Sequence, residues 1–426
     1  MSIKNFSLNG IWDFVLDTNN NGVEQNYHKQ ENQPYLDDKI KVNLPHCWNT
    51  EPQGDFKDYS GTAWYFRTFR IPVHFIGNRI FLHFERIARS AMIFIDGEEI
   101  GKFKGSFIPF EIDITKFDDL KEHFLAVRID ASENARRFPS VPDVEEYFGI
   151  FGDVFIRVEE KIALMDHFLE TKLHFSSNGS VEYAELSFTL YFKNTGNEDY
   201  SGTITLELLQ DYVSIINSER EIKILKNNSR LMKIVMIFEK PELWSPEEPN
   251  LYNLSIRVSN ELGTVIREER KIGIREIGLK EDNIILNGKI FEIRAKEFNN
   301  EIPESGYVIP EINIFKRLQE LKNQKINVIY PNQGTFSPFI INLASYFGFM
   351  VFAILPIVDL SLTEKSTYFK LYIDSINLEP SLAIYTCNNK IATNAEINKI
   401  LLSMEKLFLE IDPSHLFVNS HNLRIE

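Results

Sequence analysis

One stretch decides the fold of the carboxyl-terminal part of this chain: residues 379–390, which read EPSLAIYTCNNK. Residues 382–387 form a short, uncharged and largely apolar run, with Pro380 before it and polar Asn388 after it. Such a run is typical of a strand that is buried on both faces of a parallel sheet. We therefore predict a strand at residues 382–387.

Similar runs alternate with helical segments from about residue 287 onward. We predict strands at 290–295, 326–330, 349–355, 382–387 and 415–418. Between them we predict helices at 393–409 and at 311–324, the latter with Ile312, Phe315, Leu318 and Leu321 on one face. Alternating strands and helices imply a parallel sheet of the barrel or doubly wound type.

The segment from Ile326 to Val358 has no charged residue, and two structures fit it. One is a membrane span, which needs about 20 consecutive apolar residues. The other is a helix followed by a buried parallel strand. Pro338, Asn342 and Gly348 interrupt the apolar run. We therefore favour the helix and strand, and expect no membrane partner.

The first part of the chain, residues 1–161, consists of short strands and turns. Residues 64–71 and 79–84 alternate between apolar and polar side chains, which is typical of strands with one buried face. Residues 90–95 run into Asp96-Gly97, a strong hairpin signal. This pattern predicts a jelly-roll β-sandwich.

A second all-β part is predicted at residues 162–276. It has strands at 186–192 and 255–258, separated by turn-rich segments such as 194–197. An immunoglobulin-like sandwich, which needs about 100 residues, fits this length. Residues 277–426 form the third part, so the predicted fold class is multidomain β plus α/β.

Several runs, in this order and spacing, resemble glycoside hydrolase family 2, the β-galactosidase and β-glucuronidase family. In the first part they are residues 8–14 (LNGIWDF), 44–49 (LPHCWN), 59–65 (YSGTAWY), 94–97 (FIDG), 105–115 (GSFIPFEIDIT) and 147–154 (YFGIFGDV). In the second part they are residues 243–252 (LWSPEEPNLY) and 272–276 (IGIRE). The resemblance covers about Phe6 to Asn419. It implies a sugar-binding jelly roll, an immunoglobulin-like sandwich and a partial TIM-type barrel of about five strands.

The resemblance also implies where catalytic groups belong. Residues 379–390 are similar to the family's fourth barrel strand, which ends in Asn-Glu, and that Glu is the general acid/base. Here the two positions are Asn389 and Lys390. Glycoside hydrolysis usually needs two carboxyl groups, and a lysine has an ordinary pKa near 10.4. The family's nucleophilic Glu lies on a later barrel strand, which we expect this sequence not to reach.

The other strand ends also depart from the family's pattern. After the first strand the family has an Arg and a His-Glu pair, whereas residues 294–301 keep Arg294, lack the His and end in Glu301. Glu301 is either a displaced remnant of that pair or a surface loop residue, and we favour the loop residue. Residues 329–333 lack the family's Arg and His, and residues 351–356 lack its acidic pair. The resemblance therefore implies that this sequence has no catalytic residues.

A few residues remain candidates for sugar binding. Asn389, Tyr385 and Arg294 are expected either to line a remnant pocket or to support the barrel floor. Trp48, in a loop between prolines, is expected either to stack on a sugar or to pack in the core. The other tryptophans lie in strand-like or packing contexts and are predicted core residues: Trp12, Trp64 and Trp244.

Composition limits the number of domains and the kinds of partner and cofactor that this protein can have. A length of 426 residues predicts two to three domains, and a net charge of −15 argues against nucleic acid as a partner. Cys47 and Cys387 are far apart, so no disulfide framework is implied. The nine His are scattered, and we predict neither a metal nor a cofactor. The amino terminus has no apolar run, so we expect a cytoplasmic protein, and the Asn-, Lys- and Ile-rich composition suggests a bacterial source.

Three functions follow. We favour a non-catalytic homologue that recognises β-galactoside- or β-glucuronide-like carbohydrate. The alternatives are a structural or assembly protein, and a β-glycosidase half that a partner chain completes. Five strands do not close a barrel, so we expect self-association or a protein partner to cover the open edge.

Overall fold

The computed structural model describes residues 5–36, 38–52, 56–104, 107, 109–132, 147–281, 283–332, 334–355, 370, 372–373, 376, 378–387, 406 and 415–417. The chain divides into two compact units. The first holds residues up to Glu159 together with Asn299–Pro310 and the described part of Val358–Tyr372. The second holds the described parts of Glu160–Phe298, Glu311–Ile357 and Ile373–Glu426.

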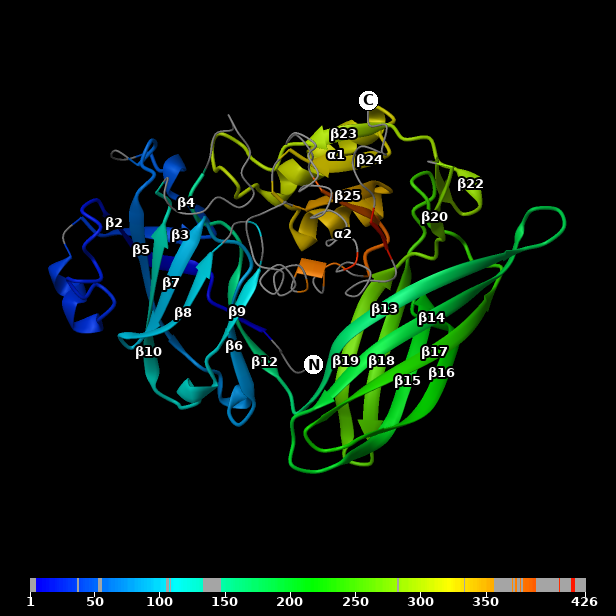
Figure 1. The fold of residues 1–426 in the computed structure, drawn as a ribbon, viewed down its shortest axis with the longest axis horizontal. Coiled ribbons are helices and arrows are strands. Elements are labelled where there is room, and N and C mark those ends of the chain that lie inside the picture. The colour runs from blue at the N-terminus through cyan, green and yellow to red at the C-terminus, as the bar shows by residue number, and fades with distance from the viewer. Residues whose placement is uncertain are drawn as a thin grey trace. The chain divides into compact units, whose positions relative to one another are not determined.

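The first unit is a sandwich of two antiparallel sheets (Figure 1). One has the order β1 (Asn5–Ser7), β12 (Val154–Glu159), β6 (Arg79–Phe84) and β9 (Phe110–Asp113). The other has the order β3 (Ile40–Leu44), β2 (Gly10–Asp17), β5 (Thr62–Arg70), β10 (Glu122–Asp130), β7 (Ser90–Ile95) and β8 (Glu98–Lys104). Short pieces complete it: β4 (His46–Cys47), β11 (Gly149–Ile150) and the 3₁₀ helices η1 (Gln30–Tyr35), η2 (Trp48–Thr50), η3 (Val73–Phe75) and η4 (Thr115–Phe117). The predicted jelly-roll architecture is confirmed.

The predicted Asp96-Gly97 hairpin joins β7 to β8. Both residues have positive φ, 51° for Asp96 and 83° for Gly97. Positive φ at both central positions defines the type I′ turn, whose twist matches that of the flanking strands. The turn thereby fixes the register of the two strands that it joins.

The first unit has a large core between its sheets and a smaller cluster on its outer face. The core includes Trp12, Trp48 and Tyr65, and also Tyr307 from the Asn299–Pro310 segment. The outer cluster contains aromatic side chains from neighbouring strands, including Trp64, with Tyr27 and Leu36 packed against it. Residues 27–36 therefore cover part of the outer face of the six-stranded sheet.

The second unit begins with the predicted immunoglobulin-like sandwich (Figure 1). One sheet has the order β13 (Ile162–Phe175), β14 (Val181–Asn194) and β17 (Asn228–Glu239). The other has the order β16 (Val213–Ile224), β15 (Tyr200–Gln210), β18 (Tyr252–Asn260) and β19 (Gly263–Ile272). Alternate side chains of both sheets meet in one apolar core.

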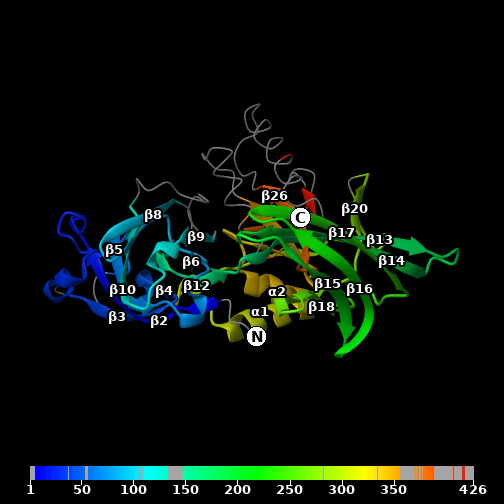
Figure 2. The same cartoon turned by 90° about the horizontal axis from the view of Figure 1, so that it is seen from below.

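The α/β part of the second unit follows a small antiparallel sheet of β20 (Ile277–Lys280), β21 (Asn283–Leu286) and β22 (Lys289–Ile290). A five-stranded sheet, parallel throughout, then has the order β23 (Ala295–Phe298), β24 (Val328–Pro331), β25 (Met350–Leu355), β26 (Leu382–Cys387) and β27 (Leu416–Phe417). Helices α1 (Glu311–Asn323) and α2 (Pro338–Phe347) lie beside each other next to the sheet (Figures 1 and 2).

The uncharged segment at 326–358 contains a strand, a helix and a second strand in its described part. Helix α2 is ten residues long. Ser337 caps its start, Pro338 is its first residue, and Gly348 ends it with a φ of 70°. No helix in the described ranges is both long and apolar enough to span a membrane.

Two details of the prediction were wrong. The first strand of the parallel sheet begins at Ala295, not at residue 290. In α1 the buried residues are Ile314, Leu318 and Leu321, whereas Ile312 and Phe315 are 57% and 44% exposed. The buried face follows the spacing i, i+4, i+7, so it lies to one side of the predicted face. The helix predicted at 393–409 falls outside the described residues, apart from residue 406.

Within the second unit, Trp244 ties the sandwich to the α/β part. Its ring is fully buried, and its Nε1 donates a hydrogen bond of 3.0 Å to the Ser345 carbonyl of α2. Arg275 Nε donates to the Pro380 carbonyl at 2.6 Å, and another of its nitrogens donates to the Leu382 carbonyl. These contacts hold the start of β26 against the sandwich.

Candidate functional site

The carboxyl edge of the parallel sheet is the first candidate site, because loops at this edge carry the ligands and catalytic groups of parallel α/β folds. Register shows which side chains share a face there. Tyr330 and Phe352 each lie two residues beyond the paired Val328 and Met350, so they share this face. Phe352 pairs with Ile384, which pairs with Leu416. Tyr330, Phe352, Ile384 and Leu416 therefore form one row. All four belong to one apolar cluster, so the described part of this face is largely hydrocarbon.

One polar pair interrupts this face near the carboxyl edge. Glu297 lies opposite Tyr330 in the register of β23 and β24. Burial, and then the Glu297 carboxylate, raise the pKa of the Tyr330 hydroxyl. The sequence did not reveal this pair, because neither residue stands at one of the polar positions that mark the family's strand ends. Parallel pairing of residues 295–298 with 328–331 would have revealed it.

Arg294 lies at the opposite, amino edge of this sheet, immediately before β23. The side chain of Asn327 positions the Arg294 backbone. The Oδ1 of Asn327 accepts a hydrogen bond from the Arg294 amide at 2.7 Å, and the Nδ2 of Asn327 donates one to the Glu292 carbonyl at 2.8 Å. The Arg294 guanidinium donates to the Lys325 carbonyl at 2.7 Å. The expectation that Arg294 marks the end of the first strand is therefore wrong, because these side-chain hydrogen bonds delay the strand's start.

Arg294 lines a cleft of about 550 Å³ within the second unit. The cleft also includes Phe175 of the sandwich, Asn287 and Asn327. Arg294 comes within 3.9 Å of Glu247 there. The cleft lies on the amino side of the parallel sheet, away from the edge where the family resemblance places its chemistry.

Tyr385 is 1% exposed and follows Ile384 in β26. Since successive side chains of a strand point to opposite faces, Tyr385 lies on the other side of the sheet from the Tyr330–Leu416 row. Its ring lies 5.8 Å from that of His415. This burial favours the supporting role. Asn389 and Lys390 lie outside the described residues, so their positions remain predictions.

Trp48 is fully buried in the first unit. Its Nε1 donates a hydrogen bond of 2.9 Å to the Tyr59 carbonyl, and its ring lies 5.7 Å from that of Phe148. A ring enclosed in this way offers no open face for stacking on a sugar, so the geometry favours the packing role. Trp12, Trp64 and Trp244 are also buried, as predicted.

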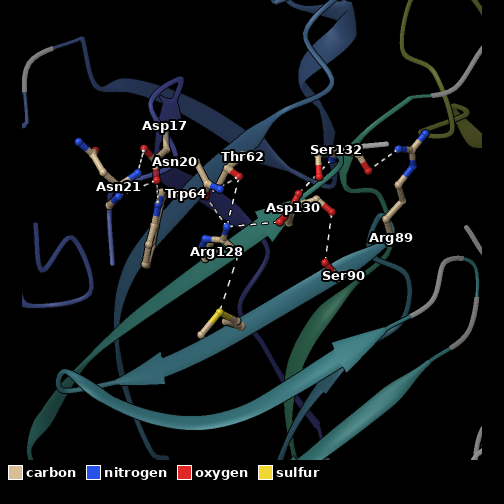
Figure 3. A network of polar contacts seen from close by, with 12 residues as sticks. Asp17, Asn20, Asn21, Thr62, Trp64, Arg89, Ser90, Arg128, Asp130 and Ser132 are labelled. Carbon is tan, nitrogen blue, oxygen red and sulfur yellow. Dashed lines mark hydrogen bonds and ion pairs between the residues drawn. The ribbon is translucent and has the colours of Figure 1, made fainter. Parts of the chain in front are cut away.

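A polar network that the sequence did not reveal lies at one end of the jelly roll (Figure 3). Arg128 donates to Asn20 Oδ1 at 2.6 Å and Thr62 Oγ1 at 3.3 Å, and pairs with Asp130 at 3.4 Å. Nearby, the Asp17 carboxylate accepts from the Trp64 indole at 3.1 Å. These groups satisfy one another's hydrogen-bonding capacity, so they hold in place the loops that they join.

Arg89 lies at the same end of the jelly roll (Figure 3). Its guanidinium donates to the carbonyls of Ala131 and Ser132 at 2.5 and 2.9 Å, and lies over the Phe148 ring. Arg89 thereby fixes the backbone just after β10. Among the described residues there is no cluster of three His, Cys, Asp or Glu side chains that could hold a metal ion.

Comparison with known proteins supports the resemblance. The model for "Glycosyl hydrolases family 2, sugar binding domain" matches residues 5–158, and the model for "Glycosyl hydrolases family 2" matches residues 163–275. The chain belongs to glycoside hydrolase family 2. It is 27% identical over 279 residues to a β-galactosidase of Thermoanaerobacter pseudethanolicus, covering 63% of this chain and 36% of that protein.

A putative β-glucuronidase of Formosa agariphila is 25% identical over 394 residues, covering 88% of this chain and 46% of the relative. A solved family 2 structure from Bacteroides cellulosilyticus superposes with a TM-score of 0.82 at 20% identity, covering 98% of this chain and 57% of that one. The Bacteroides uniformis β-glucuronidase superposes with a TM-score of 0.78 at 20% identity, covering 97% of this chain and 52% of that one. The chain thus spans about a third to a half of these curated relatives and a little over half of these solved structures.

Proposed function

We propose that this chain recognises carbohydrate without hydrolysing it. The observation that carries the proposal is Lys390, which stands where the family resemblance places the general acid/base. The sugar-binding model that matches residues 5–158 supports the recognition part. Because the relatives are described as β-galactosidases and β-glucuronidases, a β-galactoside or β-glucuronide is the expected ligand class.

The chemical argument is that a general acid must release its proton near the working pH. A lysine with a pKa near its ordinary 10.4 holds its proton at neutral pH. Glycosidases instead use a pair of carboxyl groups. The His after the first strand and the acidic pair after the third are also replaced in this sequence, so several polar groups of the family's site are changed together.

Turnover is tested with the full chain and the nitrophenyl β-galactoside and β-glucuronide. We expect no release of nitrophenol above the rate without protein. The matched variants are Lys390→Ala and Lys226→Ala, the latter removing an exposed lysine in a turn of the sandwich. Release that disappears in Lys390→Ala and persists in Lys226→Ala would overturn the non-catalytic part of the proposal.

Recognition is tested by thermal unfolding with a panel of β-linked mono- and oligosaccharides. A ligand at a hundred times its Kd stabilises the folded state by about 2.7 kcal/mol, which is a measurable shift. We expect a shift that depends on the identity of the sugar. No shift across the panel would contradict carbohydrate recognition.

A second candidate, an assembly role through copies of the chain, is favoured by one edge of the sandwich. Val213 of β16 is 67% exposed, and Val235 and Ile237 of β17 are 49% and 50% exposed. Exposed apolar residues on edge strands favour association. Sedimentation velocity should show a concentration-dependent oligomer that the double variant Val235→Lys, Ile237→Lys dissociates and Val73→Lys does not. A monomer at every concentration would remove this candidate.

A further inference from the structure

We propose that two copies of this chain pair through the edge of β17, antiparallel and related by a two-fold axis at Met236. The inference rests on the assembly role proposed above, to which it adds the strand that pairs and the register of the pairing. Strand β17 is an edge of its sheet, because the order is β13, β14 and β17. The outward backbone groups of an edge strand can form hydrogen bonds with another chain.

The solvent-facing side of β17 is apolar at its centre. Ile234, Met236 and Phe238 point into the sandwich core and are buried. Val235 and Ile237, which alternate with them, face outward and are half exposed. Exposed apolar side chains on an edge strand favour association with another strand.

A groove leaves this edge accessible. Strand β16, the edge of the other sheet, lies beside β17 (Figure 1), but the two strands belong to different sheets. The groove between them has a volume of about 490 Å³, and Val235 and Ile237 line it. The sandwich is therefore not closed by hydrogen bonds on this side, and a further strand can approach β17.

Two charged residues of opposite sign flank the apolar centre. Lys233 and Glu239 share a face with Val235 and Ile237, because alternate residues of a strand point the same way. Both are exposed. Within the described part of the chain, neither forms an ion pair. Both charges are therefore available to a partner.

The order of these four residues makes the strand complementary to itself. With the two-fold axis at Met236, Val235 lies opposite Ile237 of the second copy, and Lys233 lies opposite Glu239 of the second copy. The same contacts recur on the other side of the axis, as in every two-fold interface. Apolar pairs and pairs of opposite charge are both favourable cross-strand neighbours. This complementarity identifies the occupant of the edge as a second copy of the chain.

The two nearest registers lose this match. An axis at Val235 places Lys233 opposite Ile237 and Glu239 opposite Leu231 of the second copy. An axis at Ile237 places Glu239 opposite Val235 of the second copy. In both registers the charges face apolar side chains or the end of the strand, so the axis at Met236 is favoured.

The neighbouring edge strand lacks such a match. Strand β16 has Glu219 and Glu221 at successive positions of one face, and both are exposed. An axis at Arg220 would place these two carboxylates opposite each other, and an axis at either glutamate would place it opposite itself. Like charges directly opposite are unfavourable, so β17 is the edge that pairs.

The test is sedimentation velocity of the full chain over a range of concentrations, with an exchange of charges. We expect the wild type to form a dimer. Lys233→Glu and Glu239→Lys should each weaken it by about tenfold or more, because like charges then face each other. The double variant with both substitutions should restore the affinity of the wild type. Glu221→Lys on β16 is the control, because it changes the net charge as Glu239→Lys does, and it should leave the affinity unchanged.

Met236→Cys tests the register separately. Opposite Cα atoms of antiparallel strands lie about 4.5–5.5 Å apart, which is within the range of a disulfide. We therefore expect oxidation to link two copies of Met236→Cys. Val235→Cys is the control, because residue 235 lies opposite Ile237 of the second copy and should not form the link.

The outcomes separate this pairing from the assembly role. A monomer at every concentration would overturn both, and would leave carbohydrate recognition standing. An oligomer that neither single charge variant weakens would overturn pairing through β17 and leave the assembly role standing. Weakening by both single variants without recovery in the double variant, with no link in Met236→Cys, would overturn the register.

Discussion

Glu111 shows how the surroundings of a single residue set its contribution to stability. Two nitrogens of Arg157 donate to its carboxylate at 2.7 Å each, and His83 lies 3.0 Å away. Burial alone would raise the pKa of Glu111, but the hydrogen bonds from His83 and Arg157 outweigh it and lower the pKa to about 2. Paired geometry of this kind is the strong form of a charge-assisted hydrogen bond.

This lowered pKa predicts a pH-dependent loss in Glu111→Gln. An unfolded glutamate titrates near 4.3, so the charged pair stabilises the fold above that pH, and the effect disappears as the pH falls toward 2. A difference of roughly two units corresponds to about 3 kcal/mol of unfolding free energy at pH 7. Urea unfolding of the variant and wild type at pH 7 and near pH 2.5 measures both limits.

The matched control is Glu122→Gln, whose carboxylate is half exposed and lies 3.7 Å from Arg70. An exposed pair at this distance should contribute less than about 1 kcal/mol, with little pH dependence. Equal losses in the two variants would show that the cluster around Glu111 contributes no more than a surface ion pair.

Strand β26 was predicted with its observed bounds, because a run buried on both faces needs no information beyond its own composition. The start of β23 was not, because it depends on hydrogen bonds from Asn327, which is distant in sequence. The buried face of α1 was misplaced because Phe315 and Ile312 are as apolar as Ile314. The sequence of the helix alone therefore does not show which of these residues face the rest of the unit. At the candidate site, the family motif indicated Lys390, whereas the Glu297–Tyr330 pair required the register of the sheet.

Gly273→Ala tests the connection between the sandwich and the α/β part. A Cβ at Gly273 would lie 2.7 Å from side-chain atoms of both Trp244 and Pro380, too close without displacement of one of them. Overpacking of this kind costs about 1–3 kcal/mol. Thermal unfolding should show a lower Tm for this variant. Gly278→Ala is the control, since a Cβ there meets nothing within 4 Å, and a fall in Tm as large as that of Gly273→Ala would contradict the packing argument.

Viewed as a whole, the chain does not divide into units that are continuous in sequence. Residues Asn299–Pro310 follow β23 of the second unit, yet they belong to the first. Tyr307 in this segment packs with its ring 4.8 Å from that of Phe107 and 4.9 Å from that of Phe151. The sequence could not predict this, because the segment's position in the chain assigns it to the α/β part.

This arrangement predicts that Tyr307→Ala destabilises the first unit more than the second, although residue 307 lies beyond the sandwich in sequence. Removing a buried aromatic ring from a core costs about 3–5 kcal/mol. Hydrogen exchange, followed segment by segment, should show faster exchange in β5 and β10 and little change in β15 and β18. The control is Tyr191→Ala, which removes a ring that is 38% exposed on β14. Faster exchange confined to the second unit in Tyr307→Ala would contradict the assignment of this segment, because the lost contacts would then lie outside the jelly-roll core.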